Sequence, residues 1–285
     1  MKKIIIVSDH RDINGSPINL LDFQDYLVNQ LYDVVFYSFH KWNFDTIISN
    51  SLRRYKIGKV KIIKDVIVHR RCNVVTDFMS LVNINAPIIC KKLIVFDNAE
   101  LSYHLNGITN FFYKKDVGDL RKVLEKHRFQ DVLFLMPKCN YEKFKIKYPD
   151  LLADIFYKKI NVKPLLTISL KNNGRWFYRA EKNGGEPKDI KCKKEIDKLT
   201  LDVDLKKMFE YSGYVYYRRK DRSNIEQFGR SIFEFIILGK QVHFFDHPND
   251  KNDGLKDYWN YYGQGDRITV INMMCEDYKY KPWEV

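Results

Sequence analysis

Residues 3–31, KIIIVSDHRDINGSPINLLDFQDYLVNQL, decide how the chain begins to fold. They open on an uninterrupted apolar run at 4–7, of the kind found in strands that are buried on both faces. Residues 14–17, NGSP, break this run, and leucines and a valine then recur at helical spacing as far as Leu31. This order of strand, glycine-bearing loop and helix predicts the first βα unit of a parallel sheet.

The same alternation continues through the first half of the chain. Strands are expected at 34–39, 60–63, 66–68, 93–96 and 132–136, and helices at 43–53, 75–83 and 117–127. Strands that alternate with helices predict a doubly wound α/β domain over residues 1–160. The aperiodic stretch 158–164, which ends in Pro164, is the expected linker.

A second α/β domain is expected over residues 161–285. Its strands are predicted at 165–170, 215–217 and 242–245, and its helices at 190–199, 205–211 and 225–238. The last thirty residues are rich in aromatic side chains. We expect this C-terminal segment to pack back against the N-terminal domain.

The charge of the chain points to an anionic partner. Its 285 residues include 49 Lys and Arg against 36 Asp and Glu, which gives a formal net charge of +13. Nucleic acid and an anionic membrane surface are the partners that such a balance favours. The alternative is a lysine-rich genome, because the cations are spread along the chain.

Targeting and redox signals favour the cytoplasm. No stretch approaches the ~20 apolar residues of a membrane span, and no signal-peptide core follows the first residues. The five cysteines are odd in number and form no C-x-x-C pair, which argues against a disulfide framework and a zinc cluster. We expect a monomer with buried free thiols in the cytoplasm, which is the host cytoplasm if the chain is viral.

The segment most informative about function is EQFGRSIFEFIILGKQV, residues 226–242. Seven residues separate Glu226 from Glu234, Gly229 lies where a helix would begin, and Gly239 ends that helix before a strand. This arrangement resembles the E-x7-E element of two-domain (GT-B) glycosyltransferases. The resemblance implies two Rossmann-like domains that face each other across a cleft, with the nucleotide-sugar donor bound by the C-terminal domain.

Elementary chemistry agrees with this resemblance. A glycine at a helix N-terminus leaves backbone N–H groups and the positive end of the helix dipole open to a diphosphate. Arg230 can neutralise phosphate without a metal, and Glu234 can accept both hydroxyls of a ribose. The expected donor is a UDP-sugar, with no tightly bound cofactor and no required metal. The alternative, a solvated Glu234 on an amphipathic helix, is disfavoured by its apolar neighbours.

Other basic residues are candidates for phosphate binding. Arg218 and Arg219 lie in the loop expected after the strand 215–217, and open α/β sheets bind ligands at the carboxyl ends of their strands. Arg175 and Arg179 occupy the place where similar enzymes have a diphosphate-binding residue. A solvated basic loop is the alternative for Arg218 and Arg219. For Arg175 and Arg179 the phosphate-binding role stays open.

The stretch KLIVFDNAE, residues 92–100, places Asp97 at the end of a buried strand. It resembles the acceptor-side strand of the bacteriophage DNA glycosyltransferases, which ends in an Asp that deprotonates the hydroxymethyl group of the base. The resemblance makes Asp97 the general base. The alternative is an Asp that caps the following helix.

Two further groups of polar residues follow strands. Asp9, His10 and Gly15 come after the first strand, where Gly15 permits close approach of the backbone to an acceptor or donor, and His10 is either a base or a cap. His243, Asp246 and His247 suggest a metal. Their rings follow a strand and would not share a face, so no metal site is expected.

Together these patterns predict transfer of a sugar from a nucleoside-diphosphate sugar to a hydroxymethylated base in double-stranded DNA, flipped out of the duplex. One alternative is a lipopolysaccharide or wall-polymer acceptor at the membrane face. The other is a non-catalytic nucleic-acid-binding protein. The stereochemistry stays open, because a base at Asp97 favours inversion, whereas the E-x7-E element is commoner in retaining enzymes.

Overall fold

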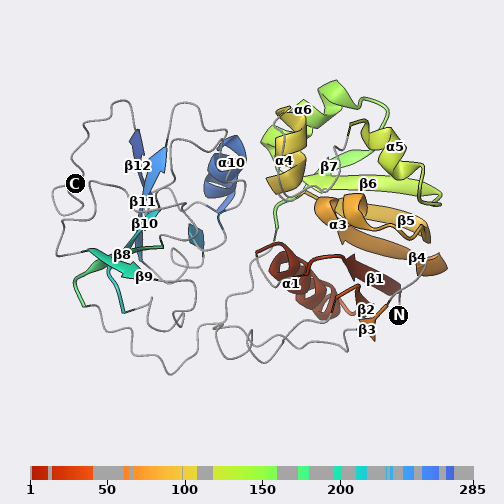
Figure 1. The fold of residues 1–285 in the computed structure, drawn as a ribbon, viewed down its shortest axis with the longest axis horizontal. Coiled ribbons are helices and arrows are strands. Elements are labelled where there is room, and N and C mark those ends of the chain that lie inside the picture. Colours follow the sequence, from red (N-terminus) through yellow and green to blue (C-terminus); the bar gives the residue numbers. More distant parts are fainter. Residues whose placement is uncertain are drawn as a thin grey trace. The chain divides into compact units, whose positions relative to one another are not determined.

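The computed structural model describes residues 2–11, 15–40, 61–63, 67–97, 99–107, 118–158, 173–179, 196–199, 210–216, 229, 232–233, 240–246, 252–262 and 268–272 (Figure 1). The chain divides into two compact units. The first comprises Met1–Ile47 and Tyr55–Asn161, and the second comprises Ile48–Arg54 and Val162–Val285.

The first unit is built on a seven-stranded parallel sheet in the order β3-β2-β1-β4-β5-β6-β7. Its strands are β1 Lys3–Ser8, β2 Asp33–Ser38, β3 Lys61–Ile62, β4 Ile67–Asp77, β5 Ile88–Phe96, β6 Asp131–Met136 and β7 Ala153–Ile155. Its described helices are α1 Gly15–Asn29, α3 Phe78–Asn83, α4 Ala99–Leu105, α5 Leu120–Leu124 and α6 Lys138–Lys147. The predicted α/β class is confirmed.

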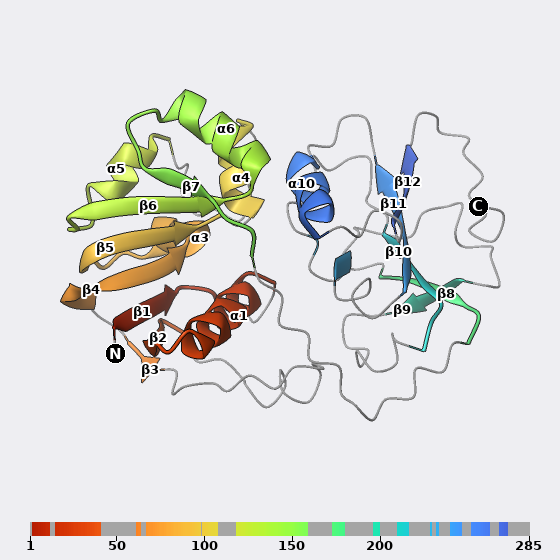
Figure 2. The same cartoon turned by 180° about the vertical axis from the view of Figure 1, so that it is seen from behind.

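Residues 4–7 of β1 are all apolar because both faces of the strand are covered. Ile4 and Ile6 belong to the apolar core that includes Leu20 and Leu21 of α1, and the turned view shows α1 alongside β1 and β2 (Figure 2). Ile5 and Val7 belong to a separate core that includes apolar residues of α3, α4, α5 and α6. Side chains that alternate along a strand thus fill two cores.

The strand order fixes where this sheet can hold a ligand. The strand β1 pairs with β2 on one side and with β4 on the other, so chain connections run in opposite directions from this point. A crevice opens at such a switch point, outside the carboxyl ends of the strands, and it is the usual ligand site of doubly wound sheets. The strand order therefore predicts a ligand site at the carboxyl ends of β1, β2 and β4.

The second unit holds a five-stranded parallel sheet in the order β12-β11-β10-β8-β9. Its elements are β8 Trp176–Arg179, β9 Ile196–Leu199, β10 Gly213–Tyr216, β11 Gln241–Asp246, α10 Asp253–Tyr262 and β12 Ile268–Asn272. Numbered along the chain, the order is 2-1-3-4-5, another doubly wound arrangement, with its switch point between β8 and β10.

Aromatic rings make up much of the core of the second unit. Phe177 stacks on Tyr214, and Tyr216 stacks on Phe244. Trp259 of α10 meets the Phe244 ring edge-on at a centroid distance of 5.3 Å. Trp259, which lies in the C-terminal segment, thus packs against the sheet of its own unit.

Two expected elements differ from the structure. Residues 196–199, predicted to be helical, form β9 because every one of them pairs with β8. The helix predicted at 75–83 begins only at Phe78, because Asp77 ends β4 and its side chain accepts the backbone N–H of Ser80 as an N-cap. The predicted helix 43–53 and strand 165–170 lie outside the described residues.

Two further properties bear on the cysteines and on membranes. Cys72 and Cys90 are free thiols, and burial raises the pKa of Cys90 to about 12, so that this thiol is unreactive at neutral pH. Within the described ranges, no helix combines the length and apolar character needed to cross a bilayer.

Candidate functional site

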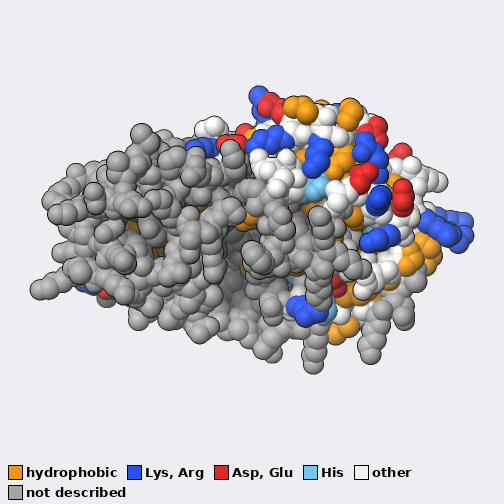
Figure 3. Space-filling view, turned by 45° about the horizontal axis from the view of Figure 1, so that its top comes forward, with side chains coloured by type: hydrophobic (Ala, Val, Ile, Leu, Met, Phe, Trp, Pro, Cys, Tyr) orange, Lys and Arg blue, Asp and Glu red, His pale blue; other side chains and the backbone are white. Residues whose placement is uncertain are grey.

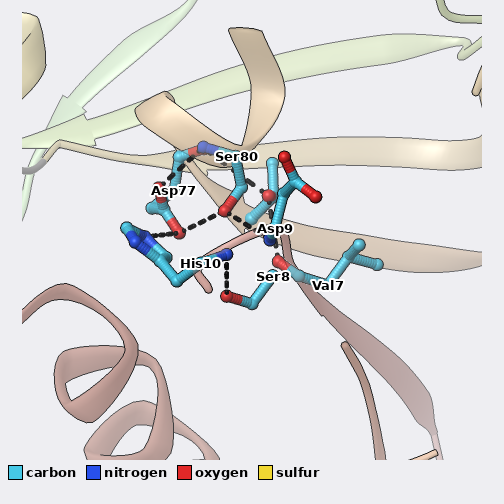
Figure 4. A network of polar contacts seen from close by, with 7 residues as sticks. Val7, Ser8, Asp9, His10, Asp77 and Ser80 are labelled. Carbon is cyan, nitrogen blue, oxygen red and sulfur yellow. Dashed lines mark hydrogen bonds and ion pairs between the residues drawn. The ribbon is translucent and has the colours of Figure 1, made fainter. Parts of the chain in front are cut away.

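Polar side chains gather at the carboxyl ends of β1, β2 and β4. Asp9 and His10 follow β1 directly, His40 lies two residues beyond β2, and Asp77 is the last residue of β4. Ser80 joins them from the first turn of α3 (Figure 4). These five residues, which we call the switch-point cluster, contain two histidine–aspartate pairs at the place where the sheet topology predicts a ligand site.

The inner pair of the cluster is fully buried. Nε2 of His10 lies 3.0 Å from Oδ2 of Asp77, and the two side chains are 2% and 0% exposed (Figure 4). Ser80 donates its hydroxyl to Oδ2 of Asp77 at 2.8 Å and its backbone N–H to Oδ1 at 2.9 Å. Burial opposes the ionised carboxylate, but the charge of His10 and these hydrogen bonds prevail, and the pKa of Asp77 is lowered.

The outer pair is accessible. Nε2 of His40 lies 3.2 Å from Oδ1 of Asp9, and the two side chains are 33% and 20% exposed. The backbone N–H of Asp9 donates to the hydroxyl of Ser80 at 2.9 Å, which ties the outer pair to the inner one. Burial raises the pKa of Asp9, although His40 acts in the opposite direction.

The backbone of His40 is held as well. Its N–H donates to the hydroxyl of Ser38 at 3.1 Å, and the same hydroxyl donates to the His40 carbonyl at 2.7 Å. A histidine that is fixed at its backbone, bonded to a carboxylate and still in contact with solvent can exchange protons with a ligand. The chemistry that the switch-point cluster supports is acid–base chemistry.

Asp97, the general base implied by the resemblance, directly follows β5 and is 1% exposed. Nδ2 of Asn140 donates to Oδ2 of Asp97 at 2.6 Å and lies equally close to the hydroxyl of Ser102. The carboxylate thus lies at the expected strand end, inside a buried polar group. A ligand would reach it only after that group opened.

Of the segment that resembles the E-x7-E element, the structure describes Gly229, Ile232, Phe233 and residues 240–242. Gly229 lies where the helix was predicted to begin. It is buried and has a left-handed backbone with φ of 58°. Its carbonyl accepts the N–H groups of Ile232 at 2.7 Å and of Phe233 at 3.1 Å, so a helical turn starts at the predicted glycine. Glu226, Arg230, Glu234, Arg218 and Arg219 lie outside the described residues.

The remaining predicted residues are Gly15, Arg175 and Arg179, and each lies at or next to the end of a helix or strand. Gly15 is the first residue of α1. Arg175 precedes β8, at the amino end of the strand, where its guanidinium bonds to both carboxylate oxygens of Asp197. Asp197 also accepts the hydroxyl of Tyr211 at 2.9 Å. This is the opposite edge from the one where a parallel sheet binds ligands, whereas Arg179 ends β8 at the carboxyl edge.

The suspected metal residues form no site within the described part of the chain. His243 is buried on β11 with its ring centroid 4.1 Å from that of Trp176, and burial lowers its pKa to about 4. Asp246 ends β11, and His247 lies outside the described residues. No group of three or more His, Cys, Asp or Glu that could hold a metal occurs among the described residues.

Sequence reasoning missed Asp77, His40 and Ser80. The sequence does contain a signal for His40 and Asp77, because each lies at the end of an apolar run, as Asp9 and Asp97 do. The strand order that makes β2 and β4 the neighbours of β1 was needed to bring them together.

Comparisons of the sequence with known proteins add no assignment to this site. No protein-family model matches the chain. No curated protein matches it either.

Proposed function

We propose that the chain is a glycosyltransferase of the two-domain (GT-B) type, which moves a sugar from a nucleoside-diphosphate sugar to an acceptor hydroxyl. The observation that carries the proposal is the conformation of Gly229, which is buried, left-handed and followed by a helical turn in the segment that resembles the E-x7-E element. Glycine adopts this backbone at a lower energetic cost than residues that have a Cβ atom.

The strand order of the second unit supports a donor site at this point. β10 and β11 are adjacent and parallel, so the segment from 217 to 240 that contains Gly229 is the crossover between them. Arg179 ends β8, and Arg218 and Arg219 follow β10 by two and three residues. Arg179 is thus at the carboxyl end of β8, and Arg218 and Arg219 come just after the carboxyl end of β10. These two strands flank the switch point, where a diphosphate is expected.

For the acceptor we propose hydroxymethylated double-stranded DNA, on the basis of charge. Exposed cations are spread over the described surface of the first unit, and they include Arg11 after β1, Arg70 and Arg71 in β4, Lys91 in β5, and Lys126 and Arg128 before β6. Lys and Arg side chains are prominent on the described face of this unit (Figure 3). Cations spread in this way would attract a polyanion at long range, and their distribution does not mark where the polyanion binds.

Donor binding tests the proposal directly. The wild-type chain should bind a UDP-sugar in titration calorimetry. Glu234→Ala should raise the dissociation constant at least about tenfold, in line with the ~1.5–3 kcal/mol of a hydrogen bond to a charged group. Glu142→Ala removes an exposed glutamate of α6 and is the matched control. Absence of binding for every nucleotide sugar tested would refute the proposal, whereas an unchanged constant in Glu234→Ala would remove only Glu234 from the site.

A further inference from the structure

We propose that His40, held by Asp9, takes the proton from the acceptor hydroxyl during sugar transfer. The inference rests on the proposed function and names a residue that performs it. It also moves the role of general base from Asp97 to the switch-point cluster.

Accessibility distinguishes the two carboxylate sites. A general base must come within hydrogen-bond distance of the proton that it removes. A third of the His40 side chain is exposed, at the carboxyl edge of β2, whereas Asp97 is 1% exposed and bonded to Asn140. The His40 side chain is therefore more accessible to an acceptor than the buried carboxylate of Asp97.

The hydrogen bond to Asp9 determines which nitrogen of His40 is the base. A carboxylate oxygen only accepts, so the nitrogen near Oδ1 of Asp9, Nε2, carries the hydrogen. In a neutral ring the other nitrogen, Nδ1, then has a free electron pair. Proton uptake at Nδ1 creates an imidazolium next to the Asp9 carboxylate, which stabilises it.

The rest of the cluster positions Asp9. The Asp9 backbone is bonded to Ser80, Ser80 to Asp77, and Asp77 to His10. Ser80, Asp77 and His10 are all buried, so this support is screened from solvent. The titratable groups that act on Asp9 are His40, His10 and Asp77, and burial has already raised its pKa, so a neighbouring cation is favourable there.

The reaction is a single displacement. The acceptor oxygen forms a bond to the anomeric carbon of the donor sugar, and the bond from that carbon to the diphosphate oxygen breaks. The nucleoside diphosphate leaves with the electron pair of the broken bond. The hydroxyl proton moves to Nδ1 of His40 and from there to water. One displacement inverts the anomeric configuration, so the product should have the configuration opposite to that of the donor.

The test compares three variants in a transfer assay with a UDP-sugar and hydroxymethylated duplex DNA. His40→Asn should lower kcat by roughly 10²–10⁴-fold with an unchanged dissociation constant for the UDP-sugar. Asp9→Asn should lower kcat with little effect on KM, because Asp9 positions His40. His69→Asn, a partly exposed histidine of β4, is the matched control and should keep wild-type kcat. Thermal unfolding identifies any variant that fails to fold, and His40→Gln then replaces it.

Different results overturn different claims. A folded His40→Asn with near-normal kcat would overturn the assignment of the base and leave the glycosyltransferase proposal standing. Retention of the anomeric configuration, read from the product by NMR, would also overturn it. A wild-type chain that neither binds the UDP-sugar nor transfers sugar would refute the proposed function, and the inference with it.

Discussion

The buried His10–Asp77 pair makes a prediction about stability that needs no substrate. Asp77→Asn keeps the shape of the side chain and removes its charge. The carboxylate accepts from His10 and twice from Ser80, and it is 0% exposed. Removal of one partner of a buried charged pair costs about 3–5 kcal/mol. We expect Asp77→Asn to lower the free energy of unfolding at pH 7 by about 3 kcal/mol.

The loss should depend on pH in a defined direction. The pKa of Asp77 is lowered in the folded chain from the ordinary 3.8. A lowered pKa means that the ionised carboxylate stabilises the fold above the unfolded-state pKa, and that this stabilisation disappears as the pH falls through the folded-state pKa. The difference between wild type and Asp77→Asn should therefore shrink as the pH falls below about 4.

Urea unfolding followed by circular dichroism measures both effects. Asp33→Asn is the matched control, because Asp33 is exposed at the start of β2. It should change the free energy of unfolding by less than about 0.5 kcal/mol. A loss below about 1 kcal/mol in Asp77→Asn, or a loss that is equal at pH 3 and pH 7, would show that the ionised Asp77 carboxylate does not stabilise the fold in this way.

Three further predictions concern other buried groups. Gly213→Ala should lower stability by about 1–3 kcal/mol, because a Cβ there would overlap the Trp176 ring, and Trp176→Ala should relieve the loss in the double variant. Burial lowers the pKa of His127 to about 4, so an NMR titration of its ring should have its midpoint near 4, and stability should fall as the pH drops from 6.5 towards 4; a midpoint near 6.5 would be inconsistent. Asp97→Asn should cost about 1–3 kcal/mol of stability and keep kcat within tenfold, which transfer assays and urea unfolding measure together.

Much of the first sheet was predictable because its strands are continuous apolar runs. The predicted strand 132–136 is one residue shorter than β6, and the predicted strand 34–39 differs from β2 by one residue at each end. Elements that depend on tertiary contacts were not found. β12 was missed, and β9 was predicted as a helix because only its pairing with β8 makes it a strand. α6 was missed as well, because only Asn140 and Phe144 of its residues are buried.

The candidate site was harder to predict than the fold. The sequence identifies Asp97 as a strand-end carboxylate, but its burial depends on Asn140, which is 43 residues away. Asp9 and His40 are 31 residues apart, and His10 and Asp77 are 67 apart. Only the parallel pairing of β1 with β2 and β4 brings them together, and the strand order cannot be deduced from periodicity.

An assay of sugar transfer tests most directly whether the chain is a glycosyltransferase that acts on hydroxymethylated DNA. The purified chain would be incubated with a panel of nucleotide sugars and with hydroxymethylated duplex DNA, unmodified duplex DNA or a lipid-linked acceptor at matched salt. Mass spectrometry of the products would follow. We expect release of the nucleoside diphosphate and one added sugar on the hydroxymethylated base, with none on unmodified DNA. Transfer to the lipid acceptor alone would contradict the DNA assignment, and the absence of sugar on every acceptor would contradict the glycosyltransferase proposal.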